Sequence, residues 1–549
     1  MPHSSPAETT HSATHPHSPP APGTNRRMLC VFPHYAPSFG TFHHSFKLVG
    51  ARAFYPPQGI LVIAAFFAAR GWAVRIVDEN LRHLTETDLA WAQVVMVSGM
   101  HVQRDKILDI TSRAHRHNLT AVLGGPSVSA APHWYPQPDM LHIGELGDAT
   151  VQLAERLEHD LHRPTTQETY PTKKRTALED FPTPAYHLAD TSAYLAGTVQ
   201  ASSGCPFKCE FCDIPELYGR KPRIKTPQQI TTELDTMLAH GIRDAVYFVD
   251  DNFIANPHAA KRLLEHLVTW QRQHRYPVDF TCEATLNITQ HPDLLALMRQ
   301  ARFTQLYVGI ETPEEDALIV MDKRQNLRSP ILQAIATINS YGIEVASGAI
   351  LGLDTDTPDT YDRFCHFIDA SNIPFLTINL LQALPHTPLW RRLEAEGRIL
   401  AAPGPGDSNV DFLLPRDTVV NGWRHVIAHA YQPDRMFARY LHQIHNTHPH
   451  RLRVPLSSPR YRPAALSRGA RITANVLWHC GIRAPYRTAF WRMATTALLR
   501  HRNPEGMLWA AVAGHHLITF TAEALEDRTE KTFYADTMPD WPSPRRGVS

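Results

Sequence analysis

The chain has 549 residues, of which 43% are hydrophobic and 19% are charged, and its formal net charge is +1. This composition is typical of a soluble globular protein with two or three domains, and no apolar run is long enough for a transmembrane helix. Seven cysteines are too few for a disulfide framework, but three of them fall within eight positions, which indicates a metal site in a reducing cytoplasm.

Residues 1–27 are rich in Pro, Ser, Thr and His and lack the pattern of a signal peptide, so we expect a disordered leader there. From residue 28 onward, strands alternate with helices, as in a parallel sheet. Helical periodicity covers Gly59–Arg70 and Arg104–His117. The buried strands that we predict are Met28–Phe32, Val74–Val77, Val94–Val97, Thr120–Leu123 and Met140–Ile143.

Three of these strands end in loops of small or polar residues. Ligands of doubly wound sheets bind at the carboxyl ends of strands, where glycine lets a bulky cofactor approach the backbone. Residues 28–160 are therefore predicted to form a Rossmann-like nucleotide- or cofactor-binding domain; the alternative is a sheet whose turns need glycine for their own conformation. The loop residues in question are Ser98, Gly99, Met100, His101, Gly124, Gly125, Gly144 and Glu145.

A second α/β series follows a Pro-containing linker at 161–196. Six βα units favour a partial (β/α)6 barrel over 197–404, with its chemistry at the carboxyl ends of the strands. Beyond residue 405 the alternation stops, and 405–549 is predicted to be mostly helical. The barrel strands that we predict are Thr198–Ala201, Ala245–Val249, Asp279–Glu283, Gln305–Ile310, Glu344–Leu351 and Leu376–Leu381.

Cys205, Cys209 and Cys212 give the spacing CxxxCxxC directly after the first predicted barrel strand. Three thiolates on one short loop can each bind one iron of a [4Fe–4S] cubane and leave the fourth iron open. A zinc site is the alternative, but it needs a fourth Cys or His close by. The nearest upstream candidate, His187, belongs to the linker.

This spacing, its place after the first strand and the aromatic residue beside the last cysteine resemble the radical S-adenosylmethionine (SAM) superfamily. The resemblance implies that the open iron binds SAM and that reductive cleavage of SAM yields a 5′-deoxyadenosyl radical. It also implies a SAM site at the strand ends, although carboxylates there also cap helices. The residues that it implies are Phe211, Asp250, Asp251, Asn252, Glu283, Glu311 and Gly348. Cys30, Cys282, Cys365 and Cys480 are interpreted as structural thiols.

A Rossmann-like domain before such a barrel resembles the cobalamin-binding class of these enzymes. The resemblance implies a corrin held between the two domains by the loop residues of the first sheet. The Asp-x-His-x-x-Gly loop whose histidine ligates cobalt in many cobalamin modules does not occur, so we expect cobalt without a histidine lower ligand, or with a weak contact from the His101 loop. The alternative is a domain that keeps the fold without the cofactor.

Longer motifs narrow the resemblance to the hopanoid methylases, and to the 2-methylase more than to the 3-methylase. It spans about 28–445 and implies methyl transfer to an unactivated sp3 carbon of a hopanoid lipid. Rival hypotheses are a methylase or cyclase acting on a tetrapyrrole or another natural product, and a sensor without turnover. The motifs that carry the resemblance are Phe32–Gly40, Pro56–Gly59, Asp78–Asn80, Gly144–Asp148, Asp213–Arg220 and Tyr247–Phe253.

Residues 451–502 contain eleven arginines and no Asp or Glu, with apolar residues between them. Basic amphipathic helices favour anionic membrane surfaces; the alternative is a packed helical domain whose arginines pair with acids elsewhere, and no RNA-binding module is evident. We therefore expect a cytoplasmic protein, with possible contact at the inner membrane surface. Its expected partners are a lipid substrate and an external electron donor such as flavodoxin or ferredoxin, without nucleic acid.

Overall fold

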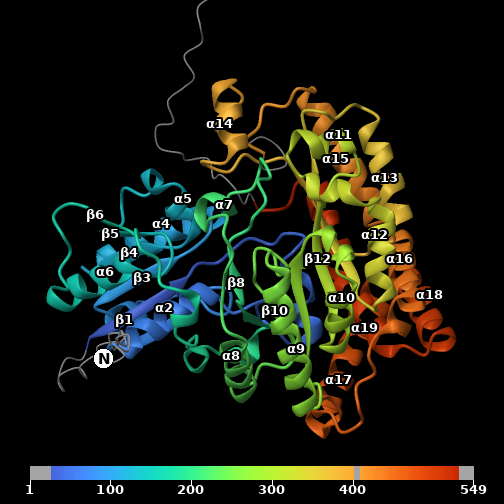
Figure 1. Cartoon of the computed structure of the whole chain (residues 1–549), viewed down its shortest axis with the longest axis horizontal. Helices are drawn as coiled ribbons and strands as arrows, with labels where there is room; N and C mark the ends of the chain where they lie inside the picture. The colour runs from blue at the N-terminus through green and yellow to red at the C-terminus, as the bar shows by residue number, and fades with distance from the viewer. Residues whose placement is uncertain (1–25, 401–407, 531–549) are drawn as a thin grey trace, which may run out of the picture.

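The computed structural model describes residues 26–400 and 408–530, so most of the predicted leader lies outside the described residues. Two parallel sheets and a helical region follow one another along the chain (Figure 1). This order is the architecture expected from the sequence: an α/β domain, an open α/β barrel and a mostly helical C-terminal region.

The first sheet has six parallel strands in the order β2-β1-β3-β4-β5-β6. Its central strands are runs of β-branched and other apolar residues, because both faces of a parallel sheet are covered by helices. The strands are β1 (Arg27–Phe32), β2 (Ala73–Asp78), β3 (Val94–Ser98), β4 (Thr120–Gly124), β5 (Met140–Ile143) and β6 (Glu168–Pro171). The helices are α1 (Phe46–Val49), α2 (Gln58–Ala69), α3 (Glu86–Trp91), α4 (Arg104–Arg116), α5 (Pro126–Ala130) and α6 (Asp148–His159).

Strand β6 was missed, because it lies in the stretch that we interpreted as a linker. It pairs with β5 at the edge of the sheet, and none of its residues is buried. An edge strand with a polar sequence and a terminal proline has no apolar run to mark it.

The second sheet also has six parallel strands, in the order β14-β13-β12-β11-β10-β7, and β7 and β14 leave it open on one side. The strands are β7 (Gly197–Val199), β10 (Asp244–Phe248), β11 (Val278–Ala284), β12 (Phe303–Glu311), β13 (Glu344–Leu351) and β14 (Leu376–Leu380). The helices are α8 (Pro227–Ala239), α9 (Pro257–Gln273), α10 (Pro292–Gln300), α11 (Glu315–Val320), α12 (Ile331–Ser340), α13 (Thr360–Ser371) and α14 (Pro388–Ala395). A small hairpin-like pair, β8 (Ser202–Ser203) and β9 (Arg223–Ile224), and helix α7 (Ile214–Leu217) flank the cysteine loop.

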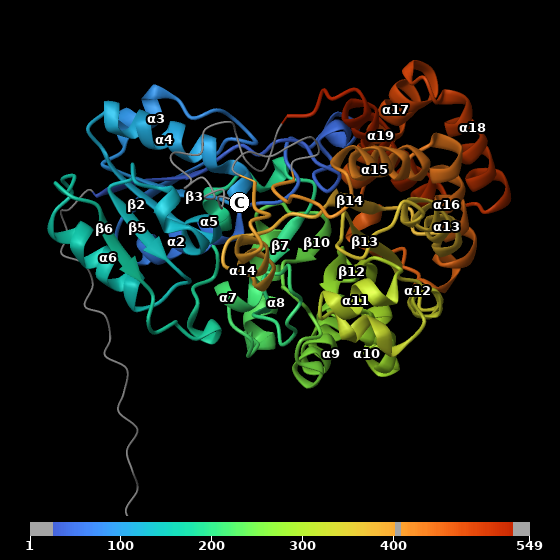
Figure 2. The same cartoon turned by 90° about the horizontal axis from the view of Figure 1, so that it is seen from above.

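The C-terminal helices pack beside the barrel, on the side away from the first sheet (Figures 1 and 2). The last helix also contacts the segment that follows β1: the hydroxyl of Ser45 donates to the carbonyl oxygen of Val512. The segment after β1 and the last helix thus meet beside the barrel. The helices are α15 (Arg416–Ala430), α16 (Pro433–Asn446), α17 (Pro463–Val476), α18 (Arg487–Thr495) and α19 (Pro504–Leu525), with π-helical segments η12 (Leu477–Arg483) and η13 (Thr496–Arg500).

Candidate active site

The three cysteines lie on the loop that follows β7 and β8. The loop turns at Gly204, whose φ of +94° is in the left-handed region. A Cβ atom at Gly204 would lie 2.7 Å from the carbonyl oxygen of Gly219, and that oxygen accepts the N–H of Cys205 at 3.2 Å. Because a larger residue would displace this turn, Gly204 sets the position of the first thiol.

The chemistry of the three thiols fits an iron–sulfur cluster. Cys209 is buried, and Cys205 and Cys212 are partly buried. Burial raises the pKa of the Cys205 and Cys212 thiols, and a cluster would bind them as thiolates. Gln325, which the sequence did not reveal, donates an N–H···S hydrogen bond to Cys209 Sγ at 3.4 Å. Such bonds to cysteine sulfur help to set the reduction potential of Fe–S clusters.

Among the described residues, no fourth Cys or His joins the three thiols, as the zinc alternative would require. Within residues 26–400 and 408–530, no three Cys, His, Asp or Glu side chains converge to hold one metal ion. Cysteines at different corners of a cubane stand farther apart than the ligands of one zinc ion. His187 packs instead with its ring centre 6.2 Å from that of His240.

Two aspartates that follow β10 hold the start of the cysteine loop. Asp250 accepts the N–H of Ala201 at 3.1 Å, and Asp251 accepts the N–H of Gly204 at 2.7 Å. Burial raises the pKa of Asp250 to about 7 and that of Asp251 to about 6. Each carboxylate therefore uses one oxygen to fix backbone, in addition to the SAM contact that remains a prediction.

The next predicted SAM residue, Asn252, is buried beside the same loop. Its side chain donates to the hydroxyl of Thr285 at 3.4 Å, and it stands close enough to the Cys205 thiol to lower the pKa of that thiol. The structure thus places Asn252 at the junction between the cysteine loop and the end of β11.

Glu311, at the end of β12, forms a buried ion pair with Lys323. Lys323 Nζ also lies 5.3 Å from the ring centre of Phe211, which precedes the third cysteine. A Cβ atom at Gly309 would lie 2.4 Å from the Glu311 carboxylate and 2.6 Å from Lys323 Nζ. Glycine at 309 therefore leaves the room that this pair needs, and the pair joins the strand end to the cysteine loop.

Glu283 of β11 faces the interior of the barrel. It accepts the hydroxyl of Tyr247 at 2.8 Å, and burial raises its pKa to about 7. On β13, a Cβ atom at Gly348 would lie 2.9 Å from the hydroxyl of Tyr307, so glycine makes room for that phenol. Glu283 and the two tyrosines give the interior a polar wall.

The raised pKa of Glu283 predicts a pH-dependent stability of the cofactor-free chain. A carboxyl group whose folded pKa is raised from 4.5 to about 7 contributes stability that is complete below pH 4.5 and is lost as the pH rises through 7. Glu283→Gln keeps an acceptor for Tyr247 but cannot ionise. We expect it to raise the free energy of unfolding by less than about 1 kcal/mol near pH 5 and by about 3 kcal/mol at pH 8, measured by chemical denaturation.

The matched control is Asp109→Asn, because Asp109 is an exposed carboxylate on α4. Its effect on the free energy of unfolding should be small, because an exposed side chain has few contacts to lose. A Glu283→Gln effect that does not change between pH 5 and pH 8 would contradict the burial argument.

A cavity of about 880 Å³ occupies the barrel interior, and its lining residues were not identified from the sequence. Alternate strand residues line it, such as Ala245 and Tyr247 of β10, as the pleat of a strand requires. The open side between β7 and β14 is closed by residues 40–55 and by α19, where the rings of Phe42 and Trp509 lie 5.6 Å apart. The apolar wall includes Phe42, Phe54, Phe375, Leu508, Trp509 and Val512.

A second cavity, of about 470 Å³, lies between the two sheets. Its barrel side includes Gln200, Tyr218 and Val249. Its other side is the loop edge of the first sheet, where small residues leave space for a flat group against the backbone. Seven of the eight residues predicted to contact cobalamin line this cavity: Ser98, Gly99, Met100, Gly124, Gly125, Gly144 and Glu145.

The eighth residue, His101, is not on the wall of this cavity. Its ring is buried, forms a hydrogen bond with Ser127 Oγ at 2.9 Å and packs 5.2 Å from the ring of Trp134. Burial lowers its pKa to about 4. The 3-10 turn at 101–103 carries this side chain into the core, which the position of His101 after a strand could not reveal.

Glu145 connects the second cavity to the cysteine loop. Its carboxylate accepts the hydroxyl of Ser203 at 2.9 Å and pairs with Arg223 and Arg175. Ser203 and Arg223 belong to β8 and β9, which flank the loop. Glu145 therefore fixes the first domain against the part of the barrel that carries the thiols.

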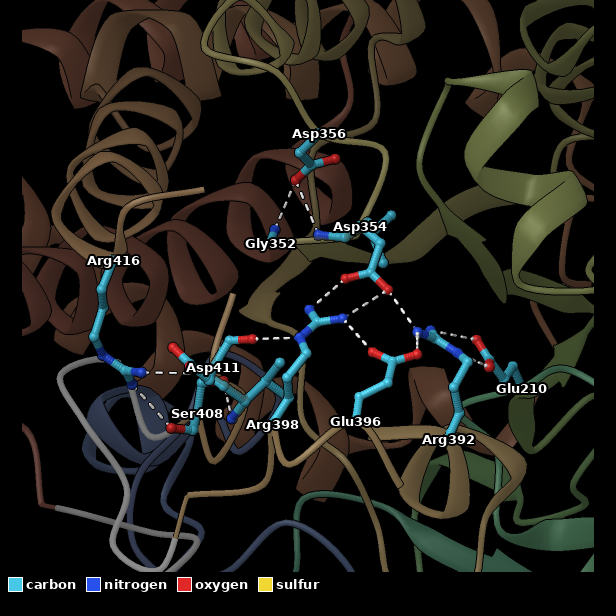
Figure 3. A network of polar contacts seen from close by, with 12 residues as sticks. Glu210, Gly352, Asp354, Asp356, Arg392, Glu396, Arg398, Ser408, Asp411 and Arg416 are labelled. Carbon is cyan, nitrogen blue, oxygen red and sulfur yellow. Dashed lines mark hydrogen bonds and ion pairs between the residues drawn. The ribbon is translucent and has the colours of Figure 1, made fainter. Parts of the chain in front are cut away.

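A network of ion pairs holds the cysteine loop from the other side (Figure 3). Glu210, between the second and third cysteines, accepts two hydrogen bonds from Arg392 of α14, at 2.6 and 3.1 Å. Arg392 also pairs with Asp354 at 2.7 Å, and Asp354 pairs with Arg398 at 2.6 Å. Planar two-point contacts of this kind fix geometry as well as adding attraction, so α14 helps to hold the loop in place.

Known protein families match the region that carries the cysteine loop, and solved structures share the fold described above. The radical SAM superfamily model matches residues 199–368, and a domain of unknown function, DUF4070, matches residues 387–530. Among solved structures, the cobalamin-dependent SAM radical enzyme OxsB superposes with a TM-score of 0.59 at 13% identity, covering 93% of this chain and 82% of OxsB. The radical SAM methyltransferase TsrM of Kitasatospora setae gives a TM-score of 0.55 at 14% identity, covering 82% of this chain and 99% of TsrM.

At the level of sequence, the chain is similar to hopanoid C-2 methylase of Rhodopseudomonas palustris strain TIE-1. The two are 53% identical over 513 residues, which are 93% of this chain and 97% of that enzyme. The match therefore extends over nearly the full length of both chains. The chain therefore belongs to the hopanoid C-2 methylase family of radical SAM enzymes.

Proposed function

We propose that the chain is a cobalamin-dependent radical SAM methyltransferase that places a methyl group at the 2-position of the A ring of a hopanoid lipid. The observation that carries this proposal is the 53% identity to hopanoid C-2 methylase over nearly the whole of both chains. The two cavities support it: the first lies in the barrel interior and is lined by Glu283, a proposed SAM residue, and the second lies between the first sheet and Tyr218, beside the cysteine loop.

When bound, the cluster and SAM supply a radical that removes a hydrogen atom from carbon, and cobalamin supplies the methyl group. Cys205, Cys209 and Cys212 would hold the cluster. Phe211, Asp250, Asp251, Asn252, Glu283, Glu311 and Gly348 are proposed to surround SAM, and the seven residues on the first-sheet side of the second cavity are proposed to contact cobalamin.

The chain's own task toward the lipid is to bind, orient and protect it. A saturated ring carbon has neither an acidic proton nor a nucleophilic electron pair, so no side chain is needed as a base. The apolar wall around Phe42 and Trp509 suits a fused hydrocarbon ring system, and it keeps water from the reacting carbon. We propose that the A ring points toward the wall that carries Glu283 and Tyr247, since β11 and β10 lead to the proposed SAM site.

The proposal includes two partners. An external electron donor such as flavodoxin or ferredoxin would reduce the cluster, and a lipid substrate gives the protein a reason to touch the inner membrane surface from the cytoplasm. The roles proposed for the cavity residues do not depend on which electron donor is used or on contact with the membrane.

The substrate is tested by lipid analysis of a hopanoid-producing bacterium from which its own 2-methylase gene is deleted. Expression of this chain is expected to restore 2-methylated hopanoids, detected by mass spectrometry, whereas the Cys209→Ala variant is not. A profile that stays unmethylated with the intact chain would contradict the hopanoid substrate. Methylation at another ring position would contradict the proposed orientation.

A further inference from the structure

The eleven arginines of residues 451–502 divide into two groups. Four of them form ion pairs with acids elsewhere in the chain. Three of these partners stand at the amino ends of barrel strands, so the pairs fasten the C-terminal region beneath the barrel. The pairs are Arg451–Glu344, Arg460–Asp279, Arg468–Asp244 and Arg492–Asp434.

The other seven arginines are exposed, and none forms an ion pair with an acid that the structure describes. A helical domain stabilised by internal pairing does not need them, since a solvated arginine adds little to stability. They therefore leave a surface of uncompensated positive charge. These residues are Arg453, Arg462, Arg471, Arg483, Arg487, Arg500 and Arg502.

Large apolar side chains are exposed among these arginines. Trp478 is 51% exposed, Ile482 is 57% exposed and Leu499 is 79% exposed. Trp478 and Ile482 are four positions apart on η12, so they lie on neighbouring turns of that segment. We name this surface the basic-apolar face; it comprises Leu466, Trp478, Ile482, Arg483, Arg487, Trp491, Leu498, Leu499 and Arg500.

The contacts join η12 and α18 into one continuous part of this face. Trp491 of α18 donates its indole N–H to the carbonyl oxygen of Gly481 at 2.9 Å. The guanidinium of Arg483 lies 5.9 Å from the ring centre of Trp478. α17 and α18 lie at the end of the molecule away from the first sheet (Figures 1 and 2). α17 packs on α1, where Asn475 donates to the carbonyl oxygen of Leu48 at 3.1 Å, while the side chains of the basic-apolar face stay exposed.

The same helices reach the mouth of the barrel cavity. Arg468, Arg471 and Ile472 of α17 line the cavity, and Arg471 is exposed. Glu505, at the start of α19, is also exposed and also lines it. The cavity therefore opens to the surface beside α17, the helix that contributes Leu466 to the basic-apolar face.

We propose that the basic-apolar face docks on an anionic phospholipid bilayer and presents the mouth of the barrel cavity to it. Arginines without acid partners match anionic headgroups, and exposed Trp and Leu side chains fit the interface between headgroups and acyl chains. No described helix is long and apolar enough to cross a membrane, so the contact is with the surface. That the cavity receives a lipid rests on the proposed function; the docking itself does not.

The test is flotation of the full chain with vesicles of phosphatidylcholine, alone or mixed with phosphatidylglycerol. We expect binding to the anionic vesicles that weakens with added salt, and little binding to the neutral ones. Replacing Arg483, Arg487 and Arg500 together by glutamine is expected to lower partitioning by about a hundredfold, at roughly fivefold for each arginine. Trp478→Ser should lower it further without changing the dependence on salt.

The matched control replaces Arg116, Arg262 and Arg328 by glutamine, because these arginines are exposed on other elements without an acid partner among the described residues. Equal loss of binding in both triple variants, or binding of RNA or self-association in place of vesicle binding, would overturn the docking proposal. Methylation separates the two proposals: vesicle binding without hopanoid methylation contradicts the substrate alone. Unchanged turnover of vesicle-embedded hopanoid by the Arg483/Arg487/Arg500 variant contradicts the docking alone.

Discussion

Cys209→Ala is expected to leave a folded chain that neither holds a [4Fe–4S] cluster nor cleaves SAM. Cys209 is the buried thiol of the three, and Gln325 donates a hydrogen bond to its sulfur. A [4Fe–4S] cluster that is held by two cysteines instead of three dissociates more readily. Without the cluster, SAM cannot be cleaved. Iron content, the visible absorbance of the cluster and 5′-deoxyadenosine formation should all fall to background under anaerobic conditions.

Cys365→Ala is the matched control, because Cys365 is also a buried free thiol but lies in α13. It should retain iron and SAM cleavage. Gln325→Leu tests whether residue 325 sets the reduction potential of the cluster without being needed to bind it. We expect the cluster to form with a shifted reduction potential, because only a hydrogen bond to sulfur is removed. Full iron content in the Cys209→Ala variant would show that the cluster is held elsewhere.

Ala245→Trp is expected to block methylation while leaving SAM cleavage intact. Ala245 lines the barrel cavity two residues before Tyr247 on β10, so a tryptophan side chain would occupy space that the lipid rings need. Overpacking of a filled site costs about 1–3 kcal/mol, which corresponds to a roughly fivefold to 150-fold lower kcat/KM for the lipid. The measurement compares methylated hopanoid with 5′-deoxyadenosine in the same reaction.

Ala245→Ser is the control, because a serine adds a single atom and should leave methylation close to that of the parent chain. We expect the tryptophan variant to form 5′-deoxyadenosine without a matching amount of methylated product. If its kcat/KM for methylation equals that of the parent, the lipid does not bind in the barrel cavity.

Much of the fold follows from local sequence patterns. The predicted strands of both sheets agree with the observed ones to within one or two residues at each end. The agreement is good because runs of β-branched residues between glycine-rich turns are typical of buried strands. The cysteine loop was also recognisable, since its chemistry depends on spacing within eight residues. Strand β6 was missed because nothing in Glu168–Pro171 is buried.

The contacts that complete the site join residues far apart in the chain. Gln325 reaches Cys209 across 116 positions, and Glu145 reaches Ser203 across 58. No periodicity or short motif encodes such pairs. The barrel cavity is closed jointly by residues near position 42 and by α19 near position 509, so its wall became visible only in the folded chain.

The contacts of the C-terminal arginines could not be predicted from the sequence either. From the sequence, internal pairing and membrane contact were equally good interpretations of residues 451–502. The structure assigns four arginines to ion pairs and leaves seven exposed without an acid partner among the described residues. The sequence gives the number of charged residues, but which of them form ion pairs depends on the tertiary structure.

The most direct test of the central claim is an anaerobic reaction of the chain, carrying its cluster and cobalamin, with a reductant, an unmethylated hopanoid and SAM labelled with deuterium in its methyl group. We predict a hopanoid that carries one labelled methyl group at the 2-position of the A ring. One 5′-deoxyadenosine and one S-adenosylhomocysteine should form for each methyl group transferred. A reaction that forms 5′-deoxyadenosine but no labelled hopanoid would contradict the substrate, and a reaction that forms neither product would contradict the enzyme itself.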